Sequence, residues 1–201
     1  PDWGHIEYAR ADSCGRTFAF KHHSSVVEAA KGDAAAIQRV ADYFKTTQLN
    51  MATMLTNHDS FAGDRPWDQF KGNESQYRLA AATYLLMPGT PFVYYGEEIG
   101  MAGIPPLQND PSLRGPLSWK ADANNAGFSS AKPYRPVAPN AMTQNIATQI
   151  SDPNSLRAFY KTLIGLRNAH PSLTAGNYEN AIVENGVFSF QRSYNNEHTV
   201  V

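Results

Sequence analysis

The sequence predicts an α/β fold built from parallel strand–helix units. Mostly apolar runs at residues 49–59 and 91–95 each end abruptly in polar residues, and residues 73–87 and 152–169 carry apolar side chains at helical spacing. Strands that are buried on both faces lose the alternation of apolar and polar residues, and their polar residues gather at their carboxyl ends. The succession of such strands and helices therefore predicts a parallel sheet.

Composition limits the class of protein. The 201 residues are 42% hydrophobic, which is enough for the core of one or two domains, and the net charge is −1. Scattered charges without a basic stripe argue against a nucleic-acid partner, and no apolar run approaches the roughly 20 residues that span a membrane. Cys14 is the single cysteine, so no intrachain disulfide is possible, and we expect a buried thiol. This cysteine usage fits a cytoplasmic or periplasmic protein better than a disulfide-rich secreted one, and the compartment stays open.

The first quarter of the chain is expected to form a short strand and two helices. The strand is predicted at residues 16–20. Ser25 and Glu28 have the spacing of a capping box that would begin a helix, and Gly32 would end it. Asp33 can then cap a second helix. The buried stripe of that helix is expected at Ile37, Val40, Ala41 and Phe44.

The run at residues 49–59 is the candidate functional strand. It ends in Asn57, His58 and Asp59, at the edge where parallel sheets place the side chains that do chemistry. Taken alone, these residues fit a polar turn equally well. The loop that follows is expected to hold Asp64 and Arg65 in ion pairs.

The second half continues the pattern and then changes it. A helix at residues 73–87 is stopped by a Pro-Gly pair, and the strand at residues 91–95 runs into Gly96-Glu97-Glu98. About fifty residues without helical or strand period follow, and a loop of that length is usually functional. Asp152-Pro153 is expected to cap and begin another helix. Glu184-Asn185-Gly186 then predicts a hairpin turn inside an all-β segment.

Length limits how much of a barrel the chain can hold. A closed barrel of eight strand–helix units needs about 250 residues, and only about three units fit before residue 175. We therefore expect one domain at residues 1–175 and the beginning of an all-β domain at residues 176–201. Both ends look cut from a longer chain. An open sector of a barrel exposes strand edges and an apolar sheet face, so we expect the chain to self-associate.

Several segments in order resemble the α-amylase family of glycoside hydrolases, which are retaining enzymes with a (β/α)8 barrel. Residues 56–59 (TNHD) resemble the family's strand-seven motif, and residues 86–101 (LMPGTPFVYYGEEIGM) its passage from helix seven to strand eight. Residues 113–119 (LRGPLSW), followed by residues 126–128 (AGF), resemble the loop after strand eight, although the family more often has Thr-Pro-Met-Gln-Trp after the arginine. Residues 155–169 resemble the last barrel helix, and residues after about 175 the first strands of the β-sandwich domain. The resemblance implies a partial (β/α)8 TIM barrel of about three βα units followed by the start of that domain.

The resemblance assigns roles to the polar residues at the strand ends. Asp59 would stabilise the transition state by accepting bonds from two adjacent hydroxyls of the sugar at the cleaved bond, which an ionised carboxylate can do. His58 would donate to a hydroxyl of the same sugar, and Arg114 would either line the substrate pocket or form a surface ion pair. Asn57, Glu97 and Glu98 would contact and orient these groups without touching the sugar themselves. Aromatic side chains that could form sugar subsites or pack the loops are Trp67, Phe70, Trp119, Phe128 and Tyr134.

Glu97 and Glu98 are poor candidates for a catalytic pair, because neighbours on a strand point to opposite faces. The resemblance implies an Asp nucleophile in a Gly-x-Arg-x-Asp motif, and the chain contains no such motif. The family's acid/base Glu would align just before Pro1. Retaining chemistry needs two carboxylates about 5 Å apart, so we expect this chain to be inactive alone.

The implied function is hydrolysis of α-glucosidic bonds in α-glucans or in malto- and isomalto-oligosaccharides. One alternative is a barrel homologue that has lost catalysis and serves binding or assembly, and another is a transglycosylase or isomerase similar to trehalose synthase. A scaffold has no need of the His58–Asp59 pair, which favours an enzyme. The family often carries Ca2+, but its usual ligands come mainly from parts outside this sequence, so we expect no metal or cofactor here. Linkage preference and exo or endo action stay open.

Overall fold

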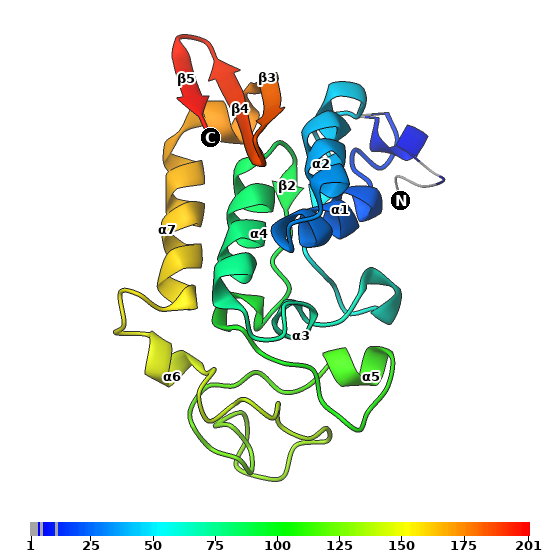
Figure 1. Cartoon of the computed structure of the whole chain (residues 1–201). Helices are drawn as coiled ribbons and strands as arrows, with labels where there is room; N and C mark the ends of the chain where they lie inside the picture. Colours follow the sequence, from blue (N-terminus) through cyan, green and yellow to red (C-terminus); the bar gives the residue numbers. More distant parts are fainter. Residues whose placement is uncertain (1–3, 5, 11) are drawn as a thin grey trace. The chain divides into compact units, whose positions relative to one another are not determined.

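The computed structural model describes residues 4, 6–10 and 12–201. Figure 1 draws them in colours that follow the sequence. They divide into two compact units. The first contains the described residues up to Leu55 together with Leu79–Phe92 and Leu163–Val201, and the second contains Thr56–Arg78 and Val93–Thr162. The boundary predicted near residue 175, between a barrel domain and an all-β domain, stays a prediction.

The first unit begins with a 3-10 turn, η1 (Ile6–Ala9), and two packed helices. Helix α1 (Phe20–Ala30) starts six residues earlier than expected, because Phe20 is itself buried within the helix. Ser25 therefore lies inside α1, and the capping box predicted there is wrong. Glu28 instead pairs with Arg39 at 2.6 Å.

Helix α2 (Ala34–Thr46) begins as the sequence predicts. The carboxylate of Asp33 accepts a hydrogen bond from the Ala36 N–H at 2.8 Å, which satisfies one of the free donors in the first helical turn. Val40, Ala41 and Phe44 of the expected stripe are buried, and Ile37 is half-buried.

Three chain segments lie side by side in parallel within the first unit. Strand β1 (Ala52–Thr53) pairs in parallel with β2 (Thr90–Pro91), and Phe18 forms an isolated parallel bridge with Ala52. Parallel pairing is confirmed, but both strands are much shorter than the runs that predicted them. Pro91 has no N–H to donate to the ladder, and bonds from Thr90 N–H to the Met51 carbonyl and from Phe92 N–H to the Thr53 carbonyl flank it. The strand expected at residues 16–20 is reduced to the single bridge.

Gly89, just before β2, occupies a turn that has no room for a side chain. Its φ is +105°, and a Cβ placed there would lie 2.7 Å from the Met51 carbonyl oxygen. Gly89→Ala is expected to lower the free energy of unfolding by about 2–4 kcal/mol, which combines a left-handed backbone with overpacking. Gly32→Ala is the matched control, since its φ is +98° but a Cβ there would meet nothing within 4 Å. In urea unfolding, the midpoint of Gly89→Ala should lie clearly below that of Gly32→Ala. Equal midpoints would contradict the clash with the Met51 carbonyl.

The C-terminal part of the first unit is a three-stranded antiparallel sheet. After α8 (Pro171–Ala175), strands β3 (Asn177–Glu184), β4 (Val187–Tyr194) and β5 (Glu197–Val200) pair in the order β3-β4-β5. The predicted hairpin is confirmed: Asn185 and Gly186 have φ of 51° and 78°, as a type I′ turn requires. The sheet packs on α2 through Tyr178, whose hydroxyl donates to the Ala41 carbonyl at 2.9 Å.

Two buried arginines hold backbone carbonyl groups of the first unit. Arg167, on helix α7 (Leu156–Ala169), donates to the carbonyls of Leu85 and Met87 at the end of helix α4 (Glu74–Leu86). Arg192 on β4 donates to the carbonyls of Gly176, Asn177 and Leu86; the distances are 2.9, 3.0 and 3.3 Å. Burial lowers the pKa of each arginine to about 10, so both remain charged at neutral pH.

The second unit is mostly irregular. Its short elements are η2 (Ser60–Ala62), α3 (Pro66–Gln69), η3 (Glu97–Ile99), α5 (Asp110–Leu113) and α6 (Ile146–Gln149). The long aperiodic stretch predicted after residue 96 is thus confirmed, with only η3, α5 and α6 inside it. Ile99, Met101 and Ala138 are buried together and give this stretch a small core.

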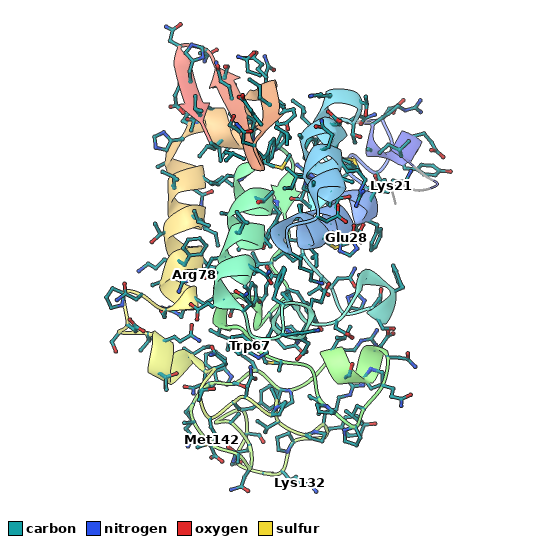
Figure 2. The ribbon with its side chains drawn as sticks, viewed as in Figure 1. Lys21, Glu28, Trp67, Arg78, Lys132 and Met142 are labelled. Carbon is teal, nitrogen blue, oxygen red and sulfur yellow. The ribbon has the colours of Figure 1, made fainter. Side chains whose placement is uncertain are left out.

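The first turns of α4 and α7 also belong to this unit. Arg78 of α4 is labelled in Figure 2. It donates to the Asn154 carbonyl at 2.5 Å, and its guanidinium carbon lies 4.9 Å from the centre of the Phe159 ring. Helix α7 begins at Leu156, and the Ser155 hydroxyl accepts from the Ala158 N–H at 3.1 Å. The start predicted at Asp152-Pro153 is therefore wrong, because Ser155 is the capping residue.

Cys14 is exposed, so the buried thiol expected from the sequence is corrected. Across the described residues, no helix combines the length and apolar character needed to cross a membrane.

Candidate active site

The candidate site is built on the turn at residues 56–60, which follows β1 in the chain. The side-chain oxygen of Asn57 accepts a hydrogen bond from the Asp59 N–H at 2.7 Å, and the Thr56 hydroxyl donates to the Gly63 carbonyl at 3.3 Å. An Asn oxygen that captures the N–H two residues on fixes a tight turn. Asp59 precedes η2 without capping it, so its carboxylate stays available for other contacts.

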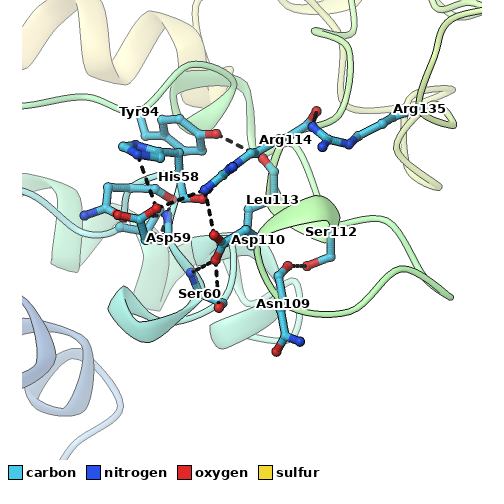
Figure 3. A network of polar contacts seen from close by, with 12 residues as sticks. His58, Asp59, Ser60, Tyr94, Asn109, Asp110, Ser112, Leu113, Arg114 and Arg135 are labelled. Atoms are coloured by element: carbon cyan, nitrogen blue, oxygen red, sulfur yellow. Dashed lines mark hydrogen bonds and ion pairs between the residues drawn. The ribbon is translucent and has the colours of Figure 1, made fainter.

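The carboxylate of Asp59 collects two positively polarised groups on one oxygen (Figure 3). His58 Nε2 lies 3.2 Å from Asp59 Oδ1, and Arg114 Nη2 lies 2.9 Å from the same atom. The Asp59 side chain is 29% exposed, whereas that of His58 is 61% exposed. Within the described residues both of these contacts are on Oδ1, and neither His58 nor Arg114 is bonded to Oδ2. The structure thus brings together all three residues assigned to catalysis and substrate binding.

Arg114 is fixed by three contacts. Its Nε donates to the His58 carbonyl at 2.8 Å, and its Nη2 donates to Asp59 Oδ1 and, at 2.7 Å, to Asp110 Oδ2. The other oxygen of Asp110 accepts from both the N–H and the hydroxyl of Ser60. The bonds from Ser60, followed by the charge of Arg114, hold the pKa of Asp110 below its usual value.

Arg114 also lines a cleft of about 480 Å³ in the second unit. Among its walls are three of the aromatic residues considered in the sequence analysis, Trp119, Phe128 and Tyr134, and each of them is at least 48% exposed. Flat, exposed rings beside a charged group are suited to stack on a ligand that has both apolar and polar faces. Phe70 is instead buried, and the Trp67 ring packs beside Gly72 and Gly100, so these two rings pack the loops.

The two glutamates after β2 occupy a different setting from the one predicted. Glu97 and Glu98 lie in the 3-10 turn η3, because Gly96 adopts a left-handed conformation, so the strand geometry assumed for them is wrong. Glu97 is fully buried and accepts from the Tyr160 hydroxyl at 2.8 Å, while its carbonyl accepts from Tyr77. Burial raises the pKa of Glu98. Their support of the site stays a prediction.

Two residues near the site were not assigned to it from the sequence. Arg65 is fully buried, and its guanidinium carbon lies 4.4 Å from the centre of the Tyr94 ring and 4.8 Å from that of the Tyr95 ring. It donates to the Tyr95 and Leu113 carbonyls, so the loop ion pair expected for it is corrected. Asp110 was not singled out. Its position four residues before Arg114 is the spacing of a helical ion pair, and that signal was available in the sequence.

Across the part of the chain that the structure describes, no group of three or more His, Cys, Asp or Glu residues could hold a metal ion.

Comparison with known proteins identifies the family of this chain. The model of the alpha amylase catalytic domain matches residues 6–176. An oligo-1,6-glucosidase of Parageobacillus thermoglucosidasius is 30% identical over 187 residues, covering 73% of this chain and 32% of its own length. The trehalose synthase/amylase TreS of Mycobacterium tuberculosis is 33% identical over 114 residues, covering 53% of this chain and 19% of its own.

Solved structures agree. The isomaltulose synthase SmuA from Protaminobacter rubrum superposes with a TM-score of 0.67 and 25% identity, over 83% of this chain and 36% of that one. The chain therefore spans about a third or less of the length of these relatives. Its family match, its parallel strands and the grouping of His58, Asp59 and Arg114 lead to one conclusion: this chain belongs to the α-amylase family and carries part of its (β/α)8 catalytic domain.

Proposed function

We propose that this chain is part of an enzyme that acts on α-glucosidic bonds of α-glucans or of malto- and isomalto-oligosaccharides by a retaining mechanism. Asp59 is the residue that stabilises the transition state. The observation that carries the proposal is the convergence of His58 Nε2 and Arg114 Nη2 on one oxygen of a partly exposed carboxylate. An acceptor that is already oriented needs little rearrangement when the sugar ring changes shape during reaction.

Each neighbouring group has a definite task in this proposal. Asp59 Oδ2 accepts from sugar hydroxyls, and such charge-assisted bonds strengthen as the ring becomes positively charged. His58, which is exposed and in contact with Asp59, donates to a hydroxyl of the same sugar. Arg114 orients Asp59 and faces the cleft, where Trp119 and Phe128 offer rings to the rest of an oligosaccharide.

Bond cleavage needs more than these residues. A retaining glycosidase uses a nucleophile and an acid/base about 5 Å apart, and the sequence motif of the nucleophile is not present among the 201 residues. We infer that this chain alone binds sugar without cleaving it. The proposal uses no cofactor of this chain, and any Ca2+ would be bound by other parts of a longer protein. Self-association through exposed strand edges stays part of the proposal.

Two alternatives share the same site. A transglycosylase or isomerase would hold the sugar in the same way and differ in what accepts it, and the trehalose synthase and isomaltulose synthase among the relatives keep this reading open. A barrel homologue without catalysis would have no use for a carboxylate held by both His58 and Arg114. That cluster favours an enzyme.

Sugar binding by the isolated chain tests the proposal. Titration with maltose or isomaltose, followed by NMR, is expected to shift the signals of His58, Asp59 and Arg114. Asp59→Asn should weaken binding about 10- to 100-fold, because a hydrogen bond to a charged group is worth about 1.5–3 kcal/mol.

Asp152→Asn is the matched control, since Asp152 is exposed and its carboxylate accepts from the nearby Asn154 N–H. It should bind as the wild type does. Wild-type affinity in Asp59→Asn would contradict the role of Asp59. Product from maltose, sucrose or starch would contradict the inference that this chain alone does not cleave.

A further inference from the structure

The Asp110 carboxylate links two chain segments that meet at the proposed sugar site. Its Oδ1 accepts from the Ser60 N–H at 2.8 Å and from the Ser60 hydroxyl at 2.9 Å, and its Oδ2 accepts from Arg114 Nη2 at 2.7 Å. Ser60 directly follows Asp59 in the chain. A single side chain thus holds both the backbone beside Asp59 and the guanidinium that contacts Asp59 (Figure 3).

The position of Arg114 between two carboxylates matters for Asp59. A guanidinium pairs most strongly with a carboxylate through two parallel bonds that use both carboxylate oxygens. Arg114 does not pair with Asp59 in this way, because its Nε donates to the His58 carbonyl and its Nη2 is shared with Asp110. Asp59 therefore contacts the arginine through Oδ1 alone.

We propose that Asp110 is a positioning residue that restrains Arg114, so that Asp59 Oδ2 remains open to accept sugar hydroxyls. This inference rests on the proposed sugar-binding role of Asp59. Without the charge of Asp110, Arg114 turns toward Asp59 and engages both of its oxygens. A partly exposed guanidinium has the freedom to do this, since 34% of the Arg114 side chain is exposed.

A purely structural role is a weaker account of Asp110. Its side chain is 37% exposed, and ion pairs of that exposure contribute little to stability. Loss of the charge is therefore expected to leave the fold intact while changing the orientation of Arg114. The two effects can be separated by experiment.

Asp110→Asn is the variant that tests the proposal. Its amide oxygen can still accept from Ser60, but its NH2 group cannot accept from Arg114. In the wild-type chain and in Asp110→Asn, two quantities are measured: the NMR signal of the Arg114 Nε–H and the affinity for maltose. We expect the arginine signal to shift and the affinity to fall at least about 5-fold, with little change in the thermal midpoint.

A double-mutant cycle with Arg114→Gln identifies the route of the effect. If Asp110 acts through Arg114, adding Asp110→Asn to Arg114→Gln changes the affinity by less than about 2-fold. Ser60→Ala is the control, because it removes one bond to Asp110 without touching Arg114, and it should leave the Arg114 signal in place. Asp110→Glu keeps the negative charge, so it should keep the wild-type Arg114 signal and most of the affinity for maltose. If Asp110→Asn does not fold, Asp110→Glu tests the proposal, and a shifted Arg114 signal in that variant would contradict it.

Several outcomes would overturn the proposal. An unchanged Arg114 signal in Asp110→Asn would do so, as would an equal loss of affinity with and without Arg114. A chain that binds no sugar in any form would defeat the proposed function instead. In that case the arginine signal, which needs no sugar, still decides whether Asp110 positions Arg114.

Discussion

Replacing His22 with Leu is expected to make the chain markedly more resistant to acid. His22 is completely buried in α1, with its ring centre 4.8 Å from that of Tyr43 and 5.3 Å from that of Phe44. Within the described residues, neither of its ring nitrogens has a hydrogen-bond partner. Burial, and then the nearby charge of His23, lowers the pKa of His22 from 6.5 to about 3.

The sign of the effect follows from this shift. The folded chain keeps His22 neutral down to about pH 3, whereas the unfolded chain takes up a proton near pH 6.5. Stability from this group is therefore complete above pH 6.5 and falls by about 1.4 kcal/mol for each pH unit below it. The loss reaches about 5 kcal/mol near pH 3. Leu cannot be protonated, so His22→Leu should lose this component of the acid sensitivity.

Urea unfolding at pH 7.5, 5.5 and 4.5 measures the difference between the two chains. At pH 4.5 His22→Leu should exceed the wild type by about 2–3 kcal/mol more than it does at pH 7.5. His198→Leu is the control, since His198 is exposed on β5 and its imidazole is near Ser193. Parallel loss of stability in wild type and His22→Leu would show that His22 does not control the acid response.

Arg167→Met is expected to be the most destabilising single change on helix α7. Arg167 Nη1 donates to the carbonyls of Leu85 and Met87 at 2.6 and 2.8 Å, and Nη2 donates to the carbonyl of Gly89 at 2.5 Å. Methionine fills the space but donates no hydrogen bond, so these carbonyls lose their charged donor. We expect the free energy of unfolding to fall by about 3–5 kcal/mol, because each buried polar group left without a partner costs about 1–3 kcal/mol.

Thermal and urea unfolding check this expectation. Lys161→Met, at an exposed position of the same helix, should change the midpoint only slightly. Arg167→Lys keeps a charge but not the planar fork, so it should lie between Arg167→Met and the wild type. If Arg167→Met were as stable as Lys161→Met, the hydrogen bonds to the end of α4 would contribute nothing measurable.

Local chemistry explains the elements that could be predicted correctly. The side chain of Asp33 caps a helix whose first N–H groups lie within its reach, and Asn185-Gly186 can adopt the left-handed backbone that a tight hairpin needs. The helix at residues 73–87 was predictable because Tyr77, Ala81 and Tyr84 recur at helical spacing, and all three are buried. In each case the residues that determine the structure lie within a few positions of one another.

Elements that depend on distant partners were predicted less well. Helix α1 begins at Phe20 because that ring finds buried packing, and this outweighs the capping signal at Ser25. Glu97 and Glu98 leave the strand pattern because Gly96 turns the chain into η3, where Tyr160 meets Glu97. A pattern of residues shows neither the packing partner nor the tertiary hydrogen bond.

The candidate site likewise has a part that neighbouring residues determine and a part that depends on distant partners. The sequence by itself determined the family motifs, and with them the roles expected for His58 and Asp59, because those residues are adjacent in one turn. Only the tertiary structure brought Arg114 to Asp59 across 55 positions and Asp110 to Ser60 across 50. Contacts of this kind depend on how two loops fold toward each other, and no local spacing specifies that distance.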